Sequence, residues 1–187
     1  MVKPNEARQG PEALANLFET HYERVVRYIA VRMGNRDEAE DMAAEVFVRA
    51  LEKLHTFQWR GIPMEAWIFR IAHNITVDHL RTNGPRKRTS PLEDAGAIEA
   101  PDDPERDAVL ATQREELLGA MKSLTDAQRE VVALRFFGGL PSSEVARVME
   151  RSDGAVRELQ SSALKKLRSI LSTPVEMSTE IKGQPRR

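Results

Sequence analysis

The sequence predicts an all-α protein built of two small helical domains joined by a flexible linker. Through most of the chain, apolar residues recur every three or four positions, which is the period of an amphipathic helix. No segment alternates with the period of two that marks a strand, and no internal repeat is visible. Residues 83–107 are rich in Pro, Asp, Glu, Gly and Ala without periodicity, a composition typical of a flexible connection.

Composition excludes several classes of protein. The 187 residues contain no cysteine, so a disulfide framework, a thiolate zinc site and a cysteine nucleophile are all excluded. No apolar run approaches the roughly 20 residues of a membrane-spanning helix. Residues 1–10 are polar and lack the apolar core of a secretory signal. We therefore expect a cytoplasmic protein with no membrane insertion.

Charge is uninformative globally and informative locally. The formal net charge of −1 does not indicate nucleic-acid binding. Between residues 151 and 168, however, five basic residues face only two acidic ones, a surplus of three. This segment is the electrostatic candidate for a DNA contact.

The first domain is predicted at 11–82, after a disordered N-terminus at 1–10. Its first helix starts near Leu14 and ends at Gly34. A second helix opens at Asp37, whose carboxylate can cap it while Glu40 completes a capping box, and it runs to about Leu54. Its predicted buried stripe is Met42, Val46, Phe47, Ala50, Leu51 and Leu54.

A loop and a third helix complete this domain. Gly61 and Pro63 are poor helix-interior residues, so residues 56–64 are predicted as a loop. The third helix runs from Glu65 to about Arg81. Its apolar face begins at Trp67, for which core packing is favoured over DNA contact.

The second domain is predicted at 108–172, after the linker at 83–107 and before a disordered tail at 173–187. A helix from about 108 to 121 is followed by a capping box at Thr125 and a helix ended by Gly138 and Gly139. Ser142 or Ser143 then caps a short helix, and Ser152 caps a last helix over 153–171. A short helix, a turn and a longer basic helix form a helix-turn-helix pattern.

The last helix would be the recognition helix. Its apolar residues Val156, Leu159, Ala163 and Leu167 share one face and should pack inward. Arginine suits guanine, glutamate can accept from a cytosine amino group, serine serves bases or phosphates, and lysine holds phosphate. For each, the alternative is a solvated helix surface. The candidate readers that this arrangement turns outward are Arg157, Glu158, Ser161, Ser162 and Lys165.

Two blocks of the first domain resemble region 2 of the sigma-70 superfamily of RNA polymerase sigma factors. The sequences DEAED at 37–41 and EVFVRA at 45–50 resemble region 2.2, the polymerase-docking helix. The sequences AWIFRIAHN at 66–74 and DHLR at 78–81 are similar to regions 2.3 and 2.4, which melt and hold the minus-ten element. The resemblance implies core-polymerase contacts by Glu38, Asp41, Met42 and Glu45. On residue types alone, the acidic residues of this set would be a solvated helix surface. It implies minus-ten contacts by Trp59, Arg60, Asn74, Asp78 and Arg81, with Trp59 equally open to packing against the core.

Residues 124–168 resemble region 4, the reader of the minus-thirty-five element. Both blocks in one short chain, without regions 1.1 or 3, are typical of the extracytoplasmic-function (ECF) group. This implies a non-enzymatic subunit that binds the beta-prime clamp and beta flap of core RNA polymerase and promoter DNA, without a cofactor, and an anti-sigma factor as a further partner. The chain departs from the family pattern at Glu150, where relatives often carry Gly, and near Ser161 and Ser162, where they often carry a basic or aromatic residue.

Two rival functions remain open on the residues alone. A helix-turn-helix regulator that is not a sigma factor would explain the second domain, and binding to polymerase would separate the two. An enzyme or metal protein would have to use His73, Asp78 and His79 near Glu65. Their spacing of five and six residues does not repeat the i, i+4 pattern of a helical zinc site, so no catalysis or metal is expected.

Overall fold

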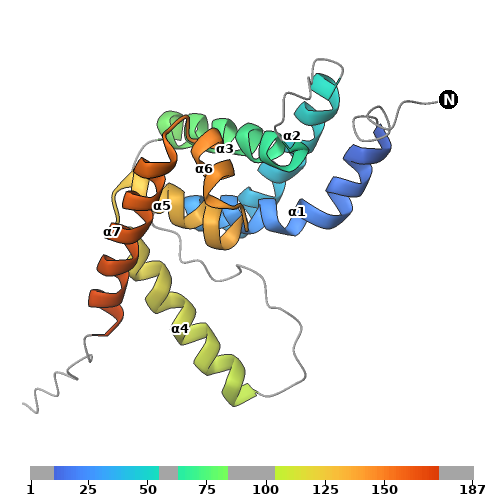
Figure 1. The fold of residues 1–187 in the computed structure, drawn as a ribbon. Helices are drawn as coiled ribbons and strands as arrows, with labels where there is room; N and C mark the ends of the chain where they lie inside the picture. The colour runs from blue at the N-terminus through green and yellow to red at the C-terminus, as the bar shows by residue number, and fades with distance from the viewer. Residues whose placement is uncertain (1–10, 55–62, 84–103, 173–187) are drawn as a thin grey trace, which may run out of the picture.

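The computed structural model describes residues 11–54, 63–83 and 104–172. Within these ranges the chain is helical and contains no strand, as predicted. No helix in the described ranges is long and apolar enough to cross a bilayer. Figure 1 shows the first three helices at one end of the chain and the later helices packed below and beside them.

The first domain consists of α1 (Pro11–Met33), α2 (Arg36–Lys53) and α3 (Met64–Asn83). Both α2 and α3 pack on α1, and they also contact each other. Gly34 follows α1 with a φ of 83°, a left-handed conformation that glycine adopts without strain. This residue therefore ends α1 where the sequence predicted.

The predicted cap of α2 was wrong by two residues. Asn35, with extended φ and ψ, is the N-cap, and its side-chain oxygen accepts from Glu38 N at 3.3 Å. Asp37 lies inside the first turn, where its charge still favours the positive end of the helix. Glu40 makes no capping box and instead accepts from Arg36 Nε at 2.8 Å.

The buried stripe of α2 was largely correct. Met42, Val46, Phe47 and Ala50 are all buried, and Leu54 is partly buried against the same core. Leu51 is the exception, because 58% of its surface is exposed. The predicted loop at 56–64 lies mostly outside the described residues, with only Pro63 and Met64 inside them.

The second domain contains four α-helices and a short π-helix. They are α4 (Pro104–Lys122), α5 (Asp126–Val132), the π-helix η3 (Ala133–Phe137), α6 (Ser142–Val148) and α7 (Asp153–Leu171). Helix α4 starts four residues before the predicted domain boundary at 108, within the predicted linker. Both α5 and α6 pack on α7, which gives the helix-turn-helix arrangement.

Two of the three predicted caps in this domain are confirmed. Thr125 and Gln128 form the reciprocal capping box of α5, with bonds of 3.3 and 3.1 Å. Ser152 Oγ accepts from Ala155 N at 3.2 Å at the start of α7. The prediction for α6 was wrong, because Pro141 is the N-cap residue and Ser142 is already helical. Proline is suited to a helix start, where its lack of an N–H costs nothing.

The π-helix was not predicted. Gly138 N donates to Ala133 O at 2.8 Å, five residues back, so one turn of wider helix closes the α5 segment. A Cβ on Gly138 would lie 2.9 Å from Cε1 of Phe69 and 2.8 Å from Leu134 O. The wide turn thus brings backbone directly against a ring from the first domain, and only glycine fits there.

The two domains pack directly on each other. Helix α1 contacts η3 and α3 contacts α6. One apolar cluster runs through both domains and contains Val25, Tyr28 and Phe69 from the first, with Leu134 and Val145 from the second. The two domains were predicted, but this contact between them was not.

Candidate nucleic-acid and polymerase interfaces

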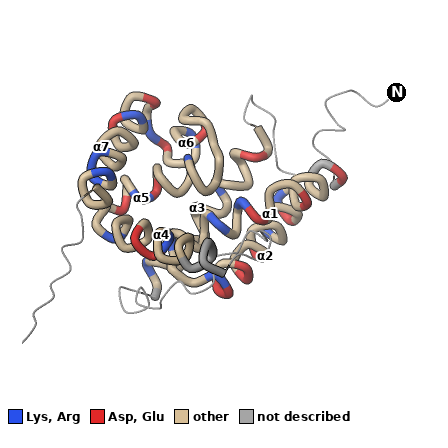
Figure 2. Tube along the Cα trace, turned by 90° about the horizontal axis from the view of Figure 1, so that it is seen from below, with Lys and Arg blue, Asp and Glu red and all other residues tan. Residues whose placement is uncertain are grey.

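Helix α7 displays one polar face and buries one apolar face. Val156 and Ala163 are fully buried and Leu167 is 6% exposed, so the predicted inward face is confirmed. The side chains of Arg157, Glu158, Ser161 and Lys165 are exposed. Figure 2 shows the basic residues spaced along α7. A rigid, capped helix therefore presents these four groups to solvent.

Ser162 does not belong to that exposed face. It is partly buried, its hydroxyl accepts from Gln128 Nε2 at 3.0 Å, and it donates to Leu159 O at 3.0 Å. The expectation that Ser162 turns outward was therefore wrong. Its hydroxyl is used to join α5 to α7.

The turn before α7 is built around Glu150. Its φ is 53°, the left-handed conformation that costs a residue with a Cβ roughly 1–2 kcal/mol. The exposed Glu150 carboxylate pairs with Arg70 Nη2 of α3. The turn thus keeps the backbone conformation that suits glycine, and the side chain contacts the other domain.

The acidic face of α2 combines charge with exposed apolar groups. Asp41 and Glu45 are exposed, and Glu45 pairs with Arg49 Nη2 at 2.5 Å. Val48 and Leu51 lie about one and two turns further along, with 56% and 58% of their surfaces exposed. Figure 2 shows acidic residues gathered at this end of the first domain. Sequence reasoning missed the apolar part of this surface, although Val48 and Leu51 follow Glu45 at helical spacing.

Two of the four predicted polymerase contacts lie elsewhere than expected. Met42 is only 6% exposed and is part of the core, so it holds α2 on α1 and does not reach the surface. Glu38 is partly exposed, and its Oε1 lies 2.9 Å from His79 Nε2 of α3. The exposed acidic groups of the predicted set are therefore Asp41 and Glu45.

Helix α3 displays polar groups on the side that faces away from its core. Asn74, Asp78 and Arg81 are exposed, and Arg81 Nη2 lies 3.3 Å from Asp78 Oδ1. Trp67 is partly buried and packs against the core, as favoured from the sequence. Trp59 and Arg60 lie outside the described residues.

The histidines considered for a metal site lie apart in the fold. His73 contacts Glu130 of the second domain, whereas His79 contacts Glu38 of α2. Within the described ranges no three histidine, aspartate or glutamate side chains are grouped as metal ligands. Each histidine thus has a carboxylate partner on a neighbouring helix.

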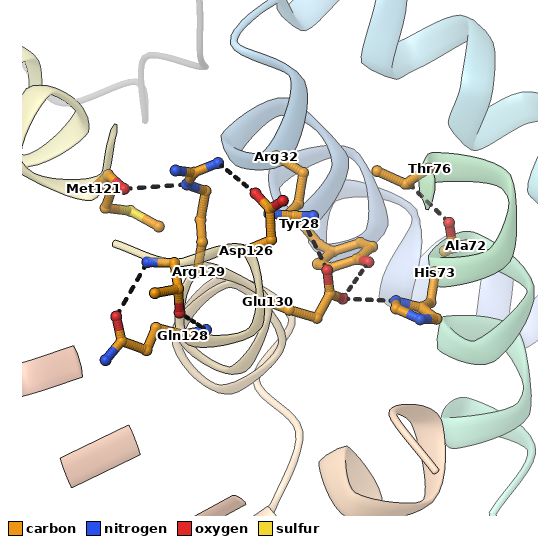
Figure 3. A network of polar contacts seen from close by, with 11 residues as sticks. Tyr28, Arg32, Ala72, His73, Thr76, Met121, Asp126, Gln128, Arg129 and Glu130 are labelled. Atoms are coloured by element: carbon orange, nitrogen blue, oxygen red, sulfur yellow. Dashed lines mark hydrogen bonds and ion pairs between the residues drawn. The ribbon is translucent and has the colours of Figure 1, made fainter. Parts of the chain in front are cut away.

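The most deeply buried charged residue in the described ranges is Glu130, at the contact between the domains (Figure 3). Only 3% of Glu130 is exposed, and the buried apolar residues Val131 and Val132 follow it directly in the chain. Tyr28 Oη donates to Glu130 Oε1 at 2.6 Å, and His73 Nδ1 lies 2.9 Å from the same oxygen. We call Tyr28, Arg32, His73 and Glu130 the Glu130 cluster.

An ion pair completes the cluster. Arg32 Nε lies 2.8 Å from Glu130 Oε2, and both side chains are only 4% exposed. The contact has ion-pair distance without the angle of a hydrogen bond, and Arg32 Nη1 has no hydrogen-bond partner within the described residues. A buried charge pair with incomplete hydrogen bonding contributes little net stability.

Protonation in the cluster follows from its contacts. Burial by itself would raise the pKa of Glu130, but the hydrogen bond from His73 and the charge of Arg32 outweigh it and lower that pKa. Burial, followed by the adjacent Glu130 charge, raises the pKa of Tyr28 well above its usual value. Glu130 is therefore a carboxylate, and Tyr28 is a protonated donor.

These features define a class of protein: two helical domains, one with a helix-turn-helix and the other with an exposed acidic and apolar helix. Comparison with known families agrees with this division. Residues 17–86 match the model of sigma-70 region 2, and residues 120–169 match that of sigma-70 region 4. The chain belongs to the ECF group of the sigma-70 family.

Individual relatives support the same membership. The chain is 32% identical over 168 residues to the ECF RNA polymerase sigma factor SigD of Mycobacterium bovis, covering 83% of this chain and 76% of that one. It is 35% identical over 160 residues to the ECF sigma factor BldN of Streptomyces coelicolor. That match covers 86% of this chain but 61% of BldN, so the chain spans less than two thirds of that relative.

Two solved structures share the fold. The sigma factor RpoE from Bartonella quintana, in complex with the anti-sigma factor NepR, aligns with a TM-score of 0.68 at 18% identity, over 87% of this chain and 99% of that one. CnrH, in complex with the cytosolic domain of CnrY, aligns with a TM-score of 0.65 at 23% identity, over 89% and 93%. The all-helical, two-domain prediction is confirmed.

Proposed function

We propose that this chain is an alternative sigma subunit that binds core RNA polymerase, directs it to specific promoters and promotes melting of the minus-ten element. One observation carries the proposal: region 2 and region 4 matches occur in that order in a single chain. A helix-turn-helix alone would fit many regulators. The first domain, with its exposed α2 and α3 surfaces, is what distinguishes this chain from them.

Polymerase docking is proposed for the exposed face of α2. Asp41 and Glu45 supply negative charge there, with Val48 and Leu51 beside them as apolar contacts. Opposite charges across an interface speed association and fix register more than they raise affinity. A basic surface on the beta-prime clamp would fit this face, and Glu38 would act by holding α2 to α3 through His79.

Minus-ten recognition is proposed for the exposed face of α3 and for the predicted loop before it. Without nucleotide hydrolysis, melting must draw its energy from holding an unstacked base in a pocket that duplex DNA cannot reach. The Asn74 amide can both donate to and accept from a base edge. Asp78 and Arg81 lie one and two turns further along, with Trp59 and Arg60 proposed as stacking and phosphate contacts.

Minus-thirty-five recognition is proposed for α7. Arg157 near the helix N-terminus suits a guanine, and Glu158 and Ser161 are placed to contact neighbouring bases. Lys165, two turns further, would contact phosphate and contribute affinity without sequence information. Ser162 is left out of this set because its hydroxyl is already bonded within the domain.

The proposal extends to partners and location. We infer that the second domain also binds the beta flap of the polymerase, and that the protein works in the cytoplasm and is not an enzyme. The RpoE and CnrH structures hold NepR, an anti-sigma factor, and the cytosolic domain of CnrY. An anti-sigma protein is therefore proposed as a regulator of this chain.

Binding to core polymerase tests the proposal directly. The wild-type chain should bind purified core enzyme in a fluorescence anisotropy titration, and Asp41→Lys/Glu45→Lys should bind at least about ten-fold more weakly because charge complementarity is reversed. Glu19→Lys is the matched control, since Glu19 is an exposed glutamate on a different helix, α1. Failure of the wild-type chain to bind would leave the helix-turn-helix regulator as the better explanation.

A further inference from the structure

Helix α7 packs on the rest of its domain through an apolar seam beneath the proposed DNA readers. Val156 and Ala163 are fully buried in this seam, and Leu159 is partly buried. Apolar packing is non-directional, and packed helices scatter by about 15–20° around their preferred crossing angles. A side chain that reads a base edge has to be held to within about 0.5 Å and 10–20°. Directional contacts are therefore needed to fix how α7 is turned.

The first directional contact joins Gln128 of α5 to Ser162 of α7. Thr125 N donates to Gln128 Oε1 at 3.1 Å as part of the capping box, so the Gln128 amide nitrogen faces α7. That nitrogen donates to Ser162 Oγ at 3.0 Å, and the Ser162 hydroxyl donates to Leu159 O at 3.0 Å. The Gln128 amide is thus bonded through both its oxygen and its nitrogen. We call this contact the Gln128–Ser162 bridge.

The second directional contact joins Arg135 of η3 to Gln160 of α7. Arg135 Nε donates to Gln160 Oε1 at 3.2 Å, and Arg135 Nη1 donates to Leu140 O. Leu140 is fully buried immediately before Pro141, the N-cap of α6. Because a guanidinium is a rigid planar fork, this one side chain ties η3, the start of α6 and α7 together in a fixed geometry. We call this contact the Arg135–Gln160 bridge.

The two bridges lie on either side of Ser161, an exposed candidate reader. Neighbouring residues of an α-helix are about 100° apart around its axis, so Gln160 and Ser162 diverge from Ser161 in opposite directions. Side-chain tips lie roughly 5–6 Å from the axis, so turning α7 by roughly 20° would move them by about 2 Å. A shift of that size breaks a hydrogen bond of 3.0 Å. Rotation of α7 is therefore opposed by both bridges.

We propose that the two bridges position α7 for sequence recognition: they set its rotation and thereby decide which bases Arg157, Glu158 and Ser161 reach. The proposal deepens, and rests on, the minus-thirty-five recognition proposed above. The four bridge residues themselves contact no DNA, because their polar groups are bonded within the domain. They are positioning residues, which act through the exposed readers of α7.

This role differs measurably from a contribution to stability alone. Loss of stability lowers binding to every DNA sequence in the same proportion. A turned helix instead brings the readers to different base atoms, so the ranking of DNA sequences changes. A wrong base pair at a position that is read lowers binding about five-fold or more. The ratio of transcription with the best base to transcription with the next-best base therefore reports on the bridges.

Transcription from promoters randomised in the minus-thirty-five region, by holoenzyme assembled from the full chain and core polymerase, measures this ratio at each position. Ser162→Ala and Gln160→Met each delete the acceptor of one bridge, and a double variant removes both. At the positions that Arg157→Ala alters, the double variant should lower the ratio at least about three-fold, and each single variant in part. Ser162→Thr and Gln160→Glu, which keep an acceptor, should retain the wild-type ratios.

Ser152→Ala is the matched control, because it also removes one side-chain hydrogen bond of α7 but involves neither bridge. It should lower transcription from all templates in proportion and leave the ratios unchanged. Ratios that the bridge variants also leave unchanged would overturn the positioning role while leaving the sigma function intact, and the single variants decide this if the double variant does not fold. A wild-type holoenzyme that selects no template would overturn the sigma function, and this proposal with it.

Discussion

Replacing Glu130 by leucine removes the acceptor shared by three side chains of the other domain. The substitution is close in size, so it leaves no large cavity. It abolishes the bond of Tyr28 Oη at 2.6 Å, the contact of His73 Nδ1 at 2.9 Å and the ion pair with Arg32 Nε at 2.8 Å. Arg32, only 7% exposed, is left as a buried charge without its carboxylate partner.

The expected cost follows from that uncompensated charge. Removing one member of a buried ion pair costs about 3–5 kcal/mol, whereas replacing both members by apolar groups is often neutral. A double variant, Arg32→Met/Glu130→Leu, removes the unpaired charge and keeps the penalty for the fully buried Tyr28 hydroxyl, about 1–3 kcal/mol. The His73 ring also loses its acceptor, but it is 21% exposed and water can reach it. The double variant should therefore be more stable than Glu130→Leu by about 2 kcal/mol, although it carries one change more.

Equilibrium unfolding in urea, followed by far-ultraviolet circular dichroism, measures both differences. Arg27→Met in the Glu130→Leu background is the matched control, because Arg27 is exposed on the same helix as Arg32. It should change the free energy of unfolding by less than about 0.5 kcal/mol. If Arg32→Met and Arg27→Met have the same effect in that background, the energetic reasoning about the Glu130 cluster is refuted.

Acid should weaken the same contact. Because the pKa of Glu130 is lowered in the folded chain, its stabilising contribution is complete above the unfolded value of 4.5 and is lost as the pH falls through the folded pKa. The difference in unfolding free energy between wild type and Glu130→Gln should be constant near neutral pH and shrink below pH 4.5. A difference that grows on acidification would contradict the assigned charge.

Three further predictions concern the second domain. Arg157→Ala should weaken promoter binding by about 1–3 kcal/mol and relax specificity at one base pair. Lys165→Ala should weaken binding to all DNA sequences alike and lower the slope of log affinity against log salt concentration by about 1. Anisotropy titrations at several salt concentrations measure both effects. Ser152→Ala should lower the free energy of unfolding by about 1 kcal/mol, measured by thermal unfolding, because it removes the N-cap of α7. Ser142→Ala should change it little, since the Ser142 hydroxyl caps no helix. Equal losses in the two variants would contradict these cap positions. Glu150→Gly should stabilise the domain by about 1 kcal/mol, because relief of the left-handed backbone strain exceeds the loss of an exposed ion pair with Arg70. A melting temperature below that of the wild type would contradict this.

The helices and most of their ends could be predicted because their signals are local. The Thr125 and Ser152 side chains each accept a hydrogen bond from the backbone N–H three residues further along the chain. The whole capping motif is therefore visible in the local sequence. At α2 two such signals competed. Asn35 is the N-cap, and Glu40, which a capping box with Asp37 would use, pairs with Arg36 instead. At α6 the proline before Ser142 has the extended backbone that the N-cap position needs.

The contact between the domains could not be predicted because its partners lie far apart in the chain. Glu130 is 102 residues from Tyr28 and 57 from His73, and no periodicity encodes either pairing. An available signal was an acidic residue next to Val131 and Val132 in a buried run. Met42 carried two expectations, a buried position from helical periodicity and a polymerase contact from family resemblance, and the structure confirms the buried position.

Run-off transcription with purified core RNA polymerase on a library of genomic fragments is the direct test of the proposed sigma function. The wild-type chain should give discrete start sites. These sites should be lost with Asn74→Ala, which removes the proposed base contact in the melted minus-ten element, and the set of sites should change with Arg157→Ala. Initiation that is no greater with the chain than with core polymerase alone would contradict the sigma function.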